Sequence, residues 1–479
     1  MIETSYLANP AIIQGGMGFN LSTWHLARTV ALRGGLGTVS GVALERVLPI
    51  TLQNGDVGGH YRRALSHFPF PHIAAEVLKV YFSERDDCRK HNLAGIPVFR
   101  VDPSPMFIKL SICANFAAVW LAKEGHSRPI SINYLEEIPP HIYAIWGAML
   151  AGVDYITVGA GIPFQIPEGI CAIMEGRIVK YRIPVEGKKD GYTLSFEPET
   201  FLGSKPPAMK RPRFLPIISS NALAGILLKR LPPGSIYGFV IEEPTAGGHN
   251  APPRGSSVLN NDGEPVYGPR DMVKYAEIAD LGLPFWIGGS KASPEKLAWA
   301  RSPEVRAAGI QVGTAFALCE ESGLDPFWRR LARQLGFEGK LRVRTDIRAS
   351  PAGFPFKVAE VPGTIFEHAK YLERRRVCKH RALVTLYEKR DGLIGYRCPS
   401  EPISAYVAKG GKLEDTIGRR CLCSHLMAAA GLGITADPGG EEEVPIITLG
   451  DDVERLMPLL MRQATDTYHV DDVFNYLEV

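Results

Sequence analysis

The residues best suited to chemistry in this chain of 479 residues are a histidine behind two glycines and several glycine-rich turns. The histidine is His249, at the end of the segment AGGH that covers residues 246–249. Imidazole exchanges a proton near neutral pH without large tuning of its pKa, and glycines let the backbone turn sharply behind it. We therefore expect His249 to be a catalytic group. A structural or solvated histidine is the alternative from these residues alone.

The second candidate site consists of two glycine-rich turns. Gly288, Gly289 and Ser290 precede Pro294, which can open a helix, and Gly313 and Thr314 stand directly before another helical stretch. Backbone N–H groups at the start of a helix bind anions, and glycine lets a phosphate approach them closely. The spacing predicts a phosphate site at Gly288, Gly289, Gly313 and Thr314. Turns that bind no ligand are the alternative interpretation.

Eight short apolar runs must position these turns. They cover residues 11–13, 36–39, 129–133, 153–158, 214–219, 236–241, 284–287 and 308–312. Helical patterns separate them, for example at residues 141–150 and 222–231, and Ser22 stands where a helix N-cap would precede Leu26. Strands alternating with helices form parallel sheets, and eight of them close a barrel.

The sequence therefore predicts an α/β protein built on a (β/α)8 TIM barrel, with the glycine-rich turns on one face. An open doubly wound sheet is the alternative fold. Its usual mark, GxGxxG directly after a strand, is missing, because the glycines at 34, 35 and 37 end a helical pattern and precede an apolar run.

Two insertions interrupt the barrel, which we place at residues 1–325. Residues 41–128 follow the second run and have the pattern of two or three helices, such as 71–82 and 105–123, which we expect to cap the barrel mouth. Residues 176–212 contain 179–183 and 192–196, the pattern of a β-hairpin. After about residue 325 the rhythm stops, and we expect a mainly helical C-terminal region over 326–479.

The composition is that of an ordinary globular protein, with 45% hydrophobic and 22% charged residues. A net charge of +3 gives no broad basic field for nucleic acid or a membrane, so a small-molecule substrate is the better expectation. No run approaches ~18 uninterrupted apolar residues, and the first residues lack the order of a signal peptide. We therefore expect a cytoplasmic protein.

Eight cysteines are too few for a secreted disulfide scaffold. Four of them, Cys378, Cys398, Cys421 and Cys423, are separated by 19, 22 and 1 residues, which is not the paired spacing of common zinc or iron–sulfur sites. We expect buried or incidental thiols and no metal, with a metal site left open. The arginine runs 374–376 and 419–420 beside them are expected to form solvated or ion-paired surface.

Four segments together resemble the nitronate monooxygenase family, formerly called 2-nitropropane dioxygenases. They are PAIIQGGMG at 10–18, AGGH at 246–249, IGG at 287–289 and GIQVGTAF at 309–316. Flavin-dependent enoyl reductases of fatty-acid and polyketide synthesis look like close relatives. The resemblance covers about residues 8 to 325 without the two insertions, and it implies a barrel that holds FMN.

The resemblance also implies roles for single residues. It places Gly16 and Met17 beside the flavin ring by their backbone, Asn133 as a polar partner of the ring, and Ser219 as a weaker flavin contact. It assigns the flavin phosphate to the four residues of the predicted phosphate site and makes His249 the catalytic histidine. The chain departs from the family at residues 242–245, EEPT, where relatives show Gly-x-Glu.

The implied function is FMN-dependent oxidation of alkyl nitronates with O2. An alternative enzyme is an NAD(P)H-dependent flavin reductase that acts on an enoyl thioester or a quinone. An alternative of another class is a flavin-binding protein whose C-terminal region serves assembly with a partner, with little turnover. The sequence leaves the physiological substrate and the oligomeric state open, a homodimer included.

Overall fold

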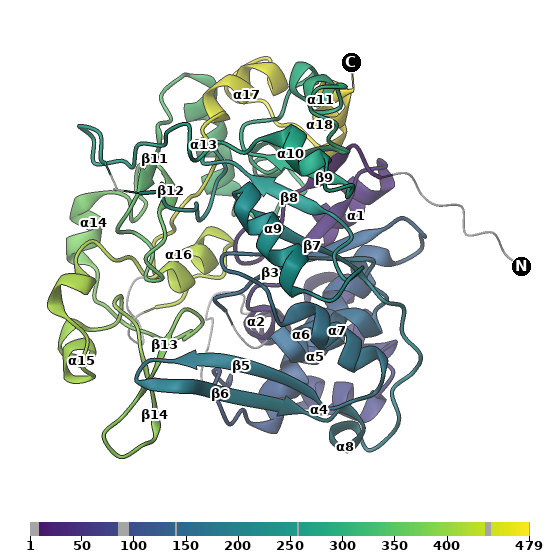
Figure 1. Cartoon of the computed structure of the whole chain (residues 1–479). Coiled ribbons are helices and arrows are strands. Elements are labelled where there is room, and N and C mark those ends of the chain that lie inside the picture. The colour runs from purple at the N-terminus through teal and green to yellow at the C-terminus, as the bar shows by residue number, and fades with distance from the viewer. Residues whose placement is uncertain (1–8, 85–94, 139–140, 256–257, 436–441, 479) are drawn as a thin grey trace, which may run out of the picture.

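Eight parallel strands form the central sheet of the protein (Figure 1). The computed structural model describes residues 9–84, 95–138, 141–255, 258–435 and 442–478. The strand order is β1-β10-β9-β8-β7-β4-β3-β2. The strands are β1 (Ile12–Gln14), β2 (Gly37–Ser40), β3 (Ile130–Leu135), β4 (Tyr155–Gly159), β7 (Arg213–Ile218), β8 (Phe239–Glu242), β9 (Phe285–Gly288) and β10 (Gly309–Val312).

The sheet closes on itself beside β1. The Gln14 N–H donates to the Leu36 carbonyl over 3.0 Å, and the Leu36 N–H donates to the Ile12 carbonyl over 2.9 Å. Buried side chains from separate strands, including Ile13, Leu215 and Trp286, pack together as a small core of their own, as the interior of such a barrel requires. The predicted barrel is confirmed, and each of the eight apolar runs overlaps a strand.

Helices follow the strands and cover the barrel. They are α1 (Trp24–Leu32), α6 (His141–Leu150), α7 (Ile166–Met174), α9 (Asn221–Arg230), α10 (Tyr275–Ala279), α11 (Pro294–Ala300) and α12 (Thr314–Ala317). The N-cap of α1 is Thr23, whose side chain accepts from the Leu26 N–H, and not Ser22 as the sequence suggested. Ser22 instead serves the loop after β1.

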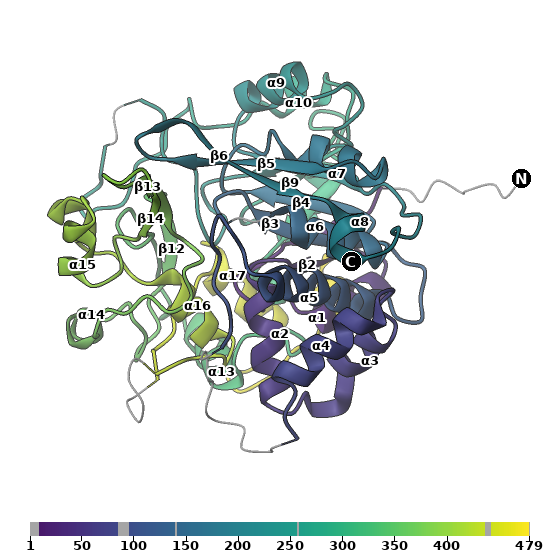
Figure 2. The same cartoon turned by 90° about the horizontal axis from the view of Figure 1, so that it is seen from below.

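The first insertion adds α2 (Leu44–Gln53), η1 (Val57–Gly59), α3 (His60–Ser66), α4 (Pro71–Tyr81) and α5 (Pro105–Lys123). Helix α5 packs against α1, α2, α3 and α6, so the insertion belongs to the outer ring and is not the expected cap on the mouth (Figure 2). By length and composition α5 could cross a membrane, but 72% of its apolar window is buried. The core helix of a globular protein passes the same test, so this single helix is weak evidence for a membrane span.

The second insertion is the predicted hairpin, formed by β5 (Val179–Val185) and β6 (Lys188–Phe196), and α8 (Pro198–Leu202) follows it. Its turn pairs with a second hairpin from the C-terminal region, β13 (Thr385–Glu388) and β14 (Ile394–Arg397). The Glu186 N–H donates to the Leu386 carbonyl over 2.8 Å, and the Glu388 N–H donates to the Glu186 carbonyl over 2.9 Å. The insertion thus joins the barrel to the C-terminal region.

The C-terminal region mixes helices and small sheets. Its other elements are α13 (Pro326–Phe337), β11 (Val343–Asp346), β12 (Phe356–Ala359), α14 (His368–Glu373), α15 (Ile403–Ala408), η2 (Leu413–Thr416), α16 (Leu422–Ala429), α17 (Val453–Leu460) and α18 (Val470–Leu477). Buried apolar side chains of this region share one continuous core with the barrel helices. A domain boundary at residue 325 stays a prediction.

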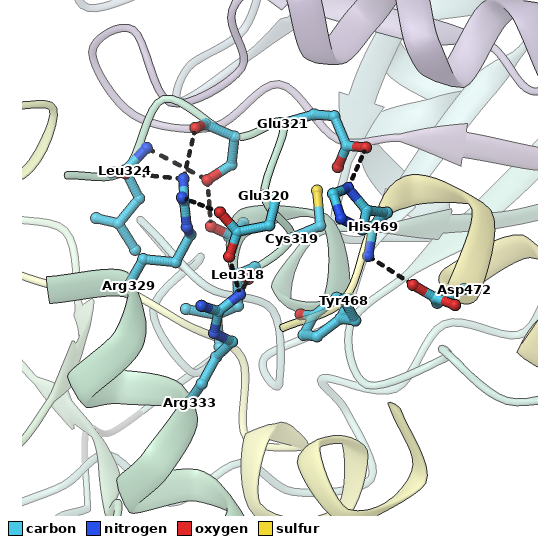
Figure 3. Close-up of polar contacts among 12 residues, drawn as sticks. Leu318, Cys319, Glu320, Glu321, Leu324, Arg329, Arg333, Tyr468, His469 and Asp472 are labelled. Atoms are coloured by element: carbon cyan, nitrogen blue, oxygen red, sulfur yellow. Dashed lines mark hydrogen bonds and ion pairs between the residues drawn. The ribbon is translucent and has the colours of Figure 1, made fainter. Parts of the chain in front are cut away.

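Polar contacts at the end of the barrel, two of them with buried arginines, link this region to the barrel (Figure 3). Glu320, just after α12, accepts from Arg329 over 2.5 Å and from Arg333 over 2.6 Å, and both arginines lie on α13. Glu321 contacts the His469 imidazole over 3.1 Å at the start of α18. Two consecutive acidic residues thus contact α13 and α18, which are far apart in the chain.

Candidate functional site

A deep cavity lies at the carboxyl ends of the barrel strands, with about 1370 Å³ of empty space when its open mouth is included. Its barrel walls are residues 15–19 after β1, Ser40 and Val42 at β2, Asn133 and Leu135 at β3, Gly159 and Ala160 at β4, Ile217 on β7, Glu242 and 246–249 at β8, 289–292 after β9, and 311–314 at β10. Residues at the ends of all eight strands thus line one cavity, at the face where TIM barrels bind their ligands.

Hydrogen bonds of Gln14 and Ser22 fix the loop after β1. The Gln14 amide nitrogen donates to Ser22 Oγ over 2.7 Å, and Ser22 Oγ donates to the Gly15 carbonyl over 3.0 Å. Ser22 Oγ also accepts from the Met17 N–H over 2.9 Å, and the Met17 carbonyl accepts from the Ser22 N–H over 3.2 Å. Because both of its backbone groups are used, Met17 can offer the cavity its side chain and not a free backbone donor.

Gly16 and Asn133 form one wall together. A Cβ at Gly16 would lie 2.3 Å from the Asn133 Cβ, so Asn133 itself requires glycine at this position. The Asn133 amide oxygen accepts from the Thr157 hydroxyl over 2.9 Å, which leaves the amide nitrogen as the group to face the cavity. The structure therefore brings these two predicted residues together as a polar wall.

The two predicted phosphate turns also meet at the cavity. Gly289, with φ of +103°, leads into Ser290, whose hydroxyl is buried without a hydrogen-bond partner among the described residues. A Cβ at Gly313 would meet only Met17 Sδ, at 3.8 Å, so this side of the turn is open. Gly288 ends β9 and does not line the cavity. An orphaned hydroxyl beside an open glycine is an arrangement that suits an anion such as a phosphate.

Two features weaken anion binding at this predicted phosphate site: its helices are short, and an acidic side chain lies beside it. Helices α11 and α12 have seven and four residues, so they contribute little dipole, and the N–H and hydroxyl groups must do the binding. The Thr314 hydroxyl accepts from the Gly450 N–H over 2.9 Å. Asp452 lines the cavity, one of its carboxyl oxygens is buried without a partner, and burial raises its pKa. An ionised Asp452 would oppose an anionic ligand here.

Ser219 lies apart from the other predicted residues. It lines a smaller neighbouring cavity with Glu242, Glu243 and Asn250, and it does not line the main one. Lys291, which does line the main cavity, forms an ion pair with Glu243. Of the predicted cofactor-binding residues, the structure gathers Gly16, Met17, Asn133, Gly289, Gly313 and Thr314 around one space.

His249 lines the cavity from the loop after β8, and the C-terminal region fixes that loop. The Asn250 N–H donates to the Pro355 carbonyl over 2.8 Å, and the Lys357 N–H donates to the Gly248 carbonyl over 2.9 Å. Gly247 packs against Leu449 so closely that a Cβ would lie 2.9 Å from the Leu449 carbonyl carbon. The loop therefore needs this glycine for a contact that its own sequence does not reveal.

Both imidazole nitrogens of His249 have a neighbour. Nε2 lies 2.7 Å from Ser350 Oγ, and Nδ1 lies 3.4 Å from Glu137 Oε1. The ring also packs edge-on against Phe356, with centroids 4.9 Å apart. Burial lowers the pKa of His249 to about 4, so the imidazole is neutral at pH 7.

Burial raises the pKa of three carboxyl groups, two in the loop after β3 and one at the end of β8. Desolvation raises the pKa of Glu137 to about 8, that of Glu242 to about 8 and that of Glu136 to about 7. Glu242 lines the cavity directly, and Glu136 accepts from the Tyr181 hydroxyl over 2.7 Å. Perturbed pKa values of this kind gather at functional sites.

Sequence reasoning missed the C-terminal contribution to the cavity. Phe356, Leu383, Leu426, Thr448, Leu449, Gly450 and Asp452 complete its walls. They lie a hundred or more residues after His249 in the chain, and no local pattern marks them. Glu242 could have been found, because it ends a predicted strand at the barrel face that carries His249.

The four C-terminal cysteines lie close enough to influence one another. Cys423 lowers the pKa of Cys421 to about 6, and the Cys421 thiol donates to Ser424 Oγ over 3.4 Å. Among the described residues, which exclude Cys88, no group of three His, Cys, Asp or Glu side chains is arranged to hold a metal ion. The neighbouring arginine runs are not solvated throughout: Arg374 pairs with Glu443 over 2.6 Å in the interior.

A scan with protein-family models and a search of curated proteins found no match. Among solved structures, the chain is similar to the enoyl reductase domain of MlnA from the macrolactin biosynthesis cluster of Bacillus amyloliquefaciens, with a TM-score of 0.50, 11% identity, and coverage of 99% of this chain and 93% of that chain. It is also similar to FabK from Thermotoga maritima, with a TM-score of 0.46, 14% identity, and coverage of 98% of this chain and 92% of that chain. A third similar structure is nitroalkane oxidase from Streptomyces ansochromogenes, with a TM-score of 0.44, 14% identity, and coverage of 98% of this chain and 95% of that chain. At 11% identity, the likeness to the MlnA domain shows a shared fold and nothing further.

Proposed function

We propose that this chain is an FMN-dependent oxidoreductase that oxidises alkyl nitronates with O2. The observation that carries the proposal is a single cavity at the carboxyl ends of the strands, where glycine turns after β1, β9 and β10 face His249 after β8. Active sites of TIM barrels lie at this face, with phosphates bound after the seventh and eighth strands. The family resemblance of the same four segments and the barrel shared with the MlnA enoyl reductase domain support it.

In this proposal the phosphate end of FMN is held by the turns after β9 and β10. Ser290 Oγ and the backbone of Gly289, Gly313 and Thr314 are the donors, and Gly313 leaves the space that a phosphate needs. The amide nitrogen of Asn133 meets the flavin ring beside Gly16. Bound flavin supplies two-electron redox chemistry, while the protein supplies orientation and electrostatics.

The charges around the cavity suit a nitronate anion. Glu137 and Glu242, each with a pKa of about 8, carry no negative charge at pH 7 and do not repel it. His249 is neutral and lines the same space. A nitronate that enters already deprotonated needs no base, so the low pKa of His249 is no obstacle to this reaction.

A second candidate is the NAD(P)H-dependent reductase of an enoyl thioester or quinone. The specific observation in its favour is that the buried acids near the mouth are protonated at neutral pH and can give a proton, whereas His249 with a pKa of about 4 is a weak base. Reduction of a double bond requires such a donor. A flavin-binding assembly protein with little turnover is the third possibility.

The test starts from the colour of the purified protein and the cofactor released on denaturation. We expect FMN, because one phosphate site is present and no second glycine-rich fingerprint for an adenosine half was found in the sequence. Anaerobic addition of propionate-3-nitronate, NADH and NADPH in separate experiments then identifies the reductant that bleaches the flavin. A colourless folded protein that takes up no FMN would contradict the proposal.

We also propose that the substrate is a small molecule and that neither nucleic acid nor a membrane is a partner. A cytoplasmic location and a homodimer remain proposals of the same standing. Gel filtration with light scattering and a salt-dependent DNA-binding assay test the oligomeric state and the nucleic-acid prediction, respectively.

A further inference from the structure

The imidazole of His249 is held between the barrel and the C-terminal region. On one side, Ser350 Oγ lies 2.7 Å from Nε2, and it also accepts from the Ala352 N–H over 3.2 Å. On the other side, Glu137 Oε1 lies 3.4 Å from Nδ1. The contact with Ser350 is short and that with Glu137 is loose, so Nδ1 is the nitrogen that can change partners.

Ser350 acts as an anchor and not as a nucleophile. Serine, histidine and glutamate are the residue types of a hydrolase triad, but Ser350 is 0% exposed and does not line the cavity. No substrate carbonyl can reach its hydroxyl in this arrangement. What Ser350 does is fix the plane and the position of the imidazole ring.

Glu137 has no other structural task that accounts for its burial. Its side chain is 14% exposed, and neither carboxyl oxygen has a hydrogen-bond partner among the described residues. A buried carboxyl without partners costs free energy, so a fold retains one where it serves a function. The neighbouring Glu136, in contrast, is bonded to Tyr181.

We propose that Glu137 is the positioning residue and proton partner of His249, and that the two side chains hold one proton between them next to the cavity. The proposal rests on the second candidate function, the reductase, because a reduced double bond needs a proton whereas a nitronate needs none. Nδ1 of His249, the nitrogen that can change partners, takes the proton from the Glu137 carboxyl and gives it to the substrate in the cavity, and the Glu137 carboxylate recovers a proton from water after the product leaves. It thus favours substrates that must be protonated.

The protonation states of the pair agree with this geometry. Between about pH 4, the pKa of His249, and about pH 8, that of Glu137, the carboxyl group keeps its proton and the imidazole is neutral, so the pair carries no net charge. Other titratable groups that line the cavity are Glu242 from β8, Lys291 after β9 and Asp452 from the C-terminal region, and Glu136 is the neighbour of Glu137 in the loop after β3. Glu136 and Glu242 titrate in the same range and need controls.

The decisive measurement is the titration of His249 by ¹⁵N NMR of histidine-labelled full-length protein. The signal is assigned among the 12 histidines by its loss in His249→Asn. In the wild type we expect both ring nitrogens to shift with a midpoint near pH 8 while the ring stays neutral. In Glu137→Gln this step should vanish, and in Glu137→Asp it should return.

Matched controls separate Glu137 from its neighbours. Glu136→Gln and Glu242→Gln should keep the step near pH 8, and Ser350→Ala should keep it but change the ratio of the two ring tautomers. A step that survives in Glu137→Gln, or a ring that itself becomes charged near pH 6.5, overturns the proposal. If Glu137→Gln does not fold, a wild-type ring that shows no shift between pH 7 and 9 overturns it equally.

Kinetics then connect the pair to the reaction. With a substrate that needs a proton, Glu137→Gln should lower kcat/KM roughly 100-fold or more and remove the alkaline limb of the pH profile. With a pre-formed nitronate the loss should stay below about 10-fold, since no proton is required. The NMR result does not depend on turnover, so a protein without flavin activity would contradict the proposed function and leave this test intact.

Discussion

Glu137→Gln should stabilise the protein against unfolding above pH 8 and leave its stability nearly unchanged at pH 5. The cause is the raised pKa of the carboxyl group, from 4.5 to about 8, which is due to desolvation. In the unfolded chain Glu137 ionises near pH 4.5, whereas in the folded chain it keeps its proton up to about pH 8. Between these values the folded state binds more protons, so the stability falls as pH rises.

The size of the effect follows from the shift. Each pKa unit corresponds to about 1.4 kcal/mol, so a shift from 4.5 to about 8 makes a difference on the order of 4 to 5 kcal/mol at pH 8.5. The side chain is 14% exposed, so little solvent screening reduces this figure. Gln has no charge to desolvate, and the pH-dependent loss should disappear with it.

Urea denaturation of the wild type and of Glu137→Gln at pH 5 and pH 8.5 tests this reasoning. We expect the difference in free energy of unfolding between the two proteins to change by several kcal/mol in favour of the variant as pH rises. The exposed Glu199→Gln serves as the control and should show no such change. The reasoning is refuted if the difference between wild type and Glu137→Gln is the same at both pH values.

Three further predictions concern the cavity. Gly313→Asp should abolish FMN retention and keep the fold, because a Cβ at this position faces open space. Full flavin occupancy in purified Gly313→Asp would place the phosphate elsewhere. Gly289→Asp is a poorer test, since a Cβ there would lie 2.8 Å from Thr245 Oγ1. Asp452→Asn should tighten FMN binding roughly 5-fold, because it removes about 1 kcal/mol of repulsion between the carboxylate and the phosphate. The gain in affinity should grow with pH, as Asp452 of the wild type ionises. Fluorescence titration with FMN measures the affinity, and weaker binding by the variant would contradict the prediction. If His249 removes the substrate proton in spite of its low pKa, His249→Asn should slow turnover of a neutral nitroalkane more than that of its nitronate, whereas equal losses would make His249 an anion-binding group; steady-state kinetics with both substrates measures the two losses.

The barrel could be predicted because its signal is local. Each strand is a short buried run that ends in, or is followed directly by, glycine or a polar residue, and a helical pattern comes after each run, so eight strands could be counted from the sequence. The cap on the mouth could not be predicted. Helix α5 is apolar on nearly all sides because α1, α2, α3 and α6 surround it, and the sequence does not say which neighbours bury a helix.

The candidate site was predictable to the extent that it lies in strand-end loops. Gly16, Asn133, Gly313 and His249 all follow or end predicted strands, and the cavity brings them together. Residues that act through tertiary contact were not predictable. The arginine runs show this most simply: Arg374 and Arg420 are buried against Glu443 and Asp346, although charge runs usually face water.

The C-terminal region supplies contacts that the loop carrying His249 cannot make by itself. Gly247 and Gly248 give the histidine loop freedom to turn, but that freedom also means that the loop cannot fix His249 by itself. The constraint comes from outside, through Thr448 Oγ1, which accepts from the Gly248 N–H over 2.7 Å, and through Ser350 at the imidazole. A region that supplies these contacts is part of the candidate site. The enzyme interpretation therefore accounts for the C-terminal contacts at His249, which an assembly protein would not need.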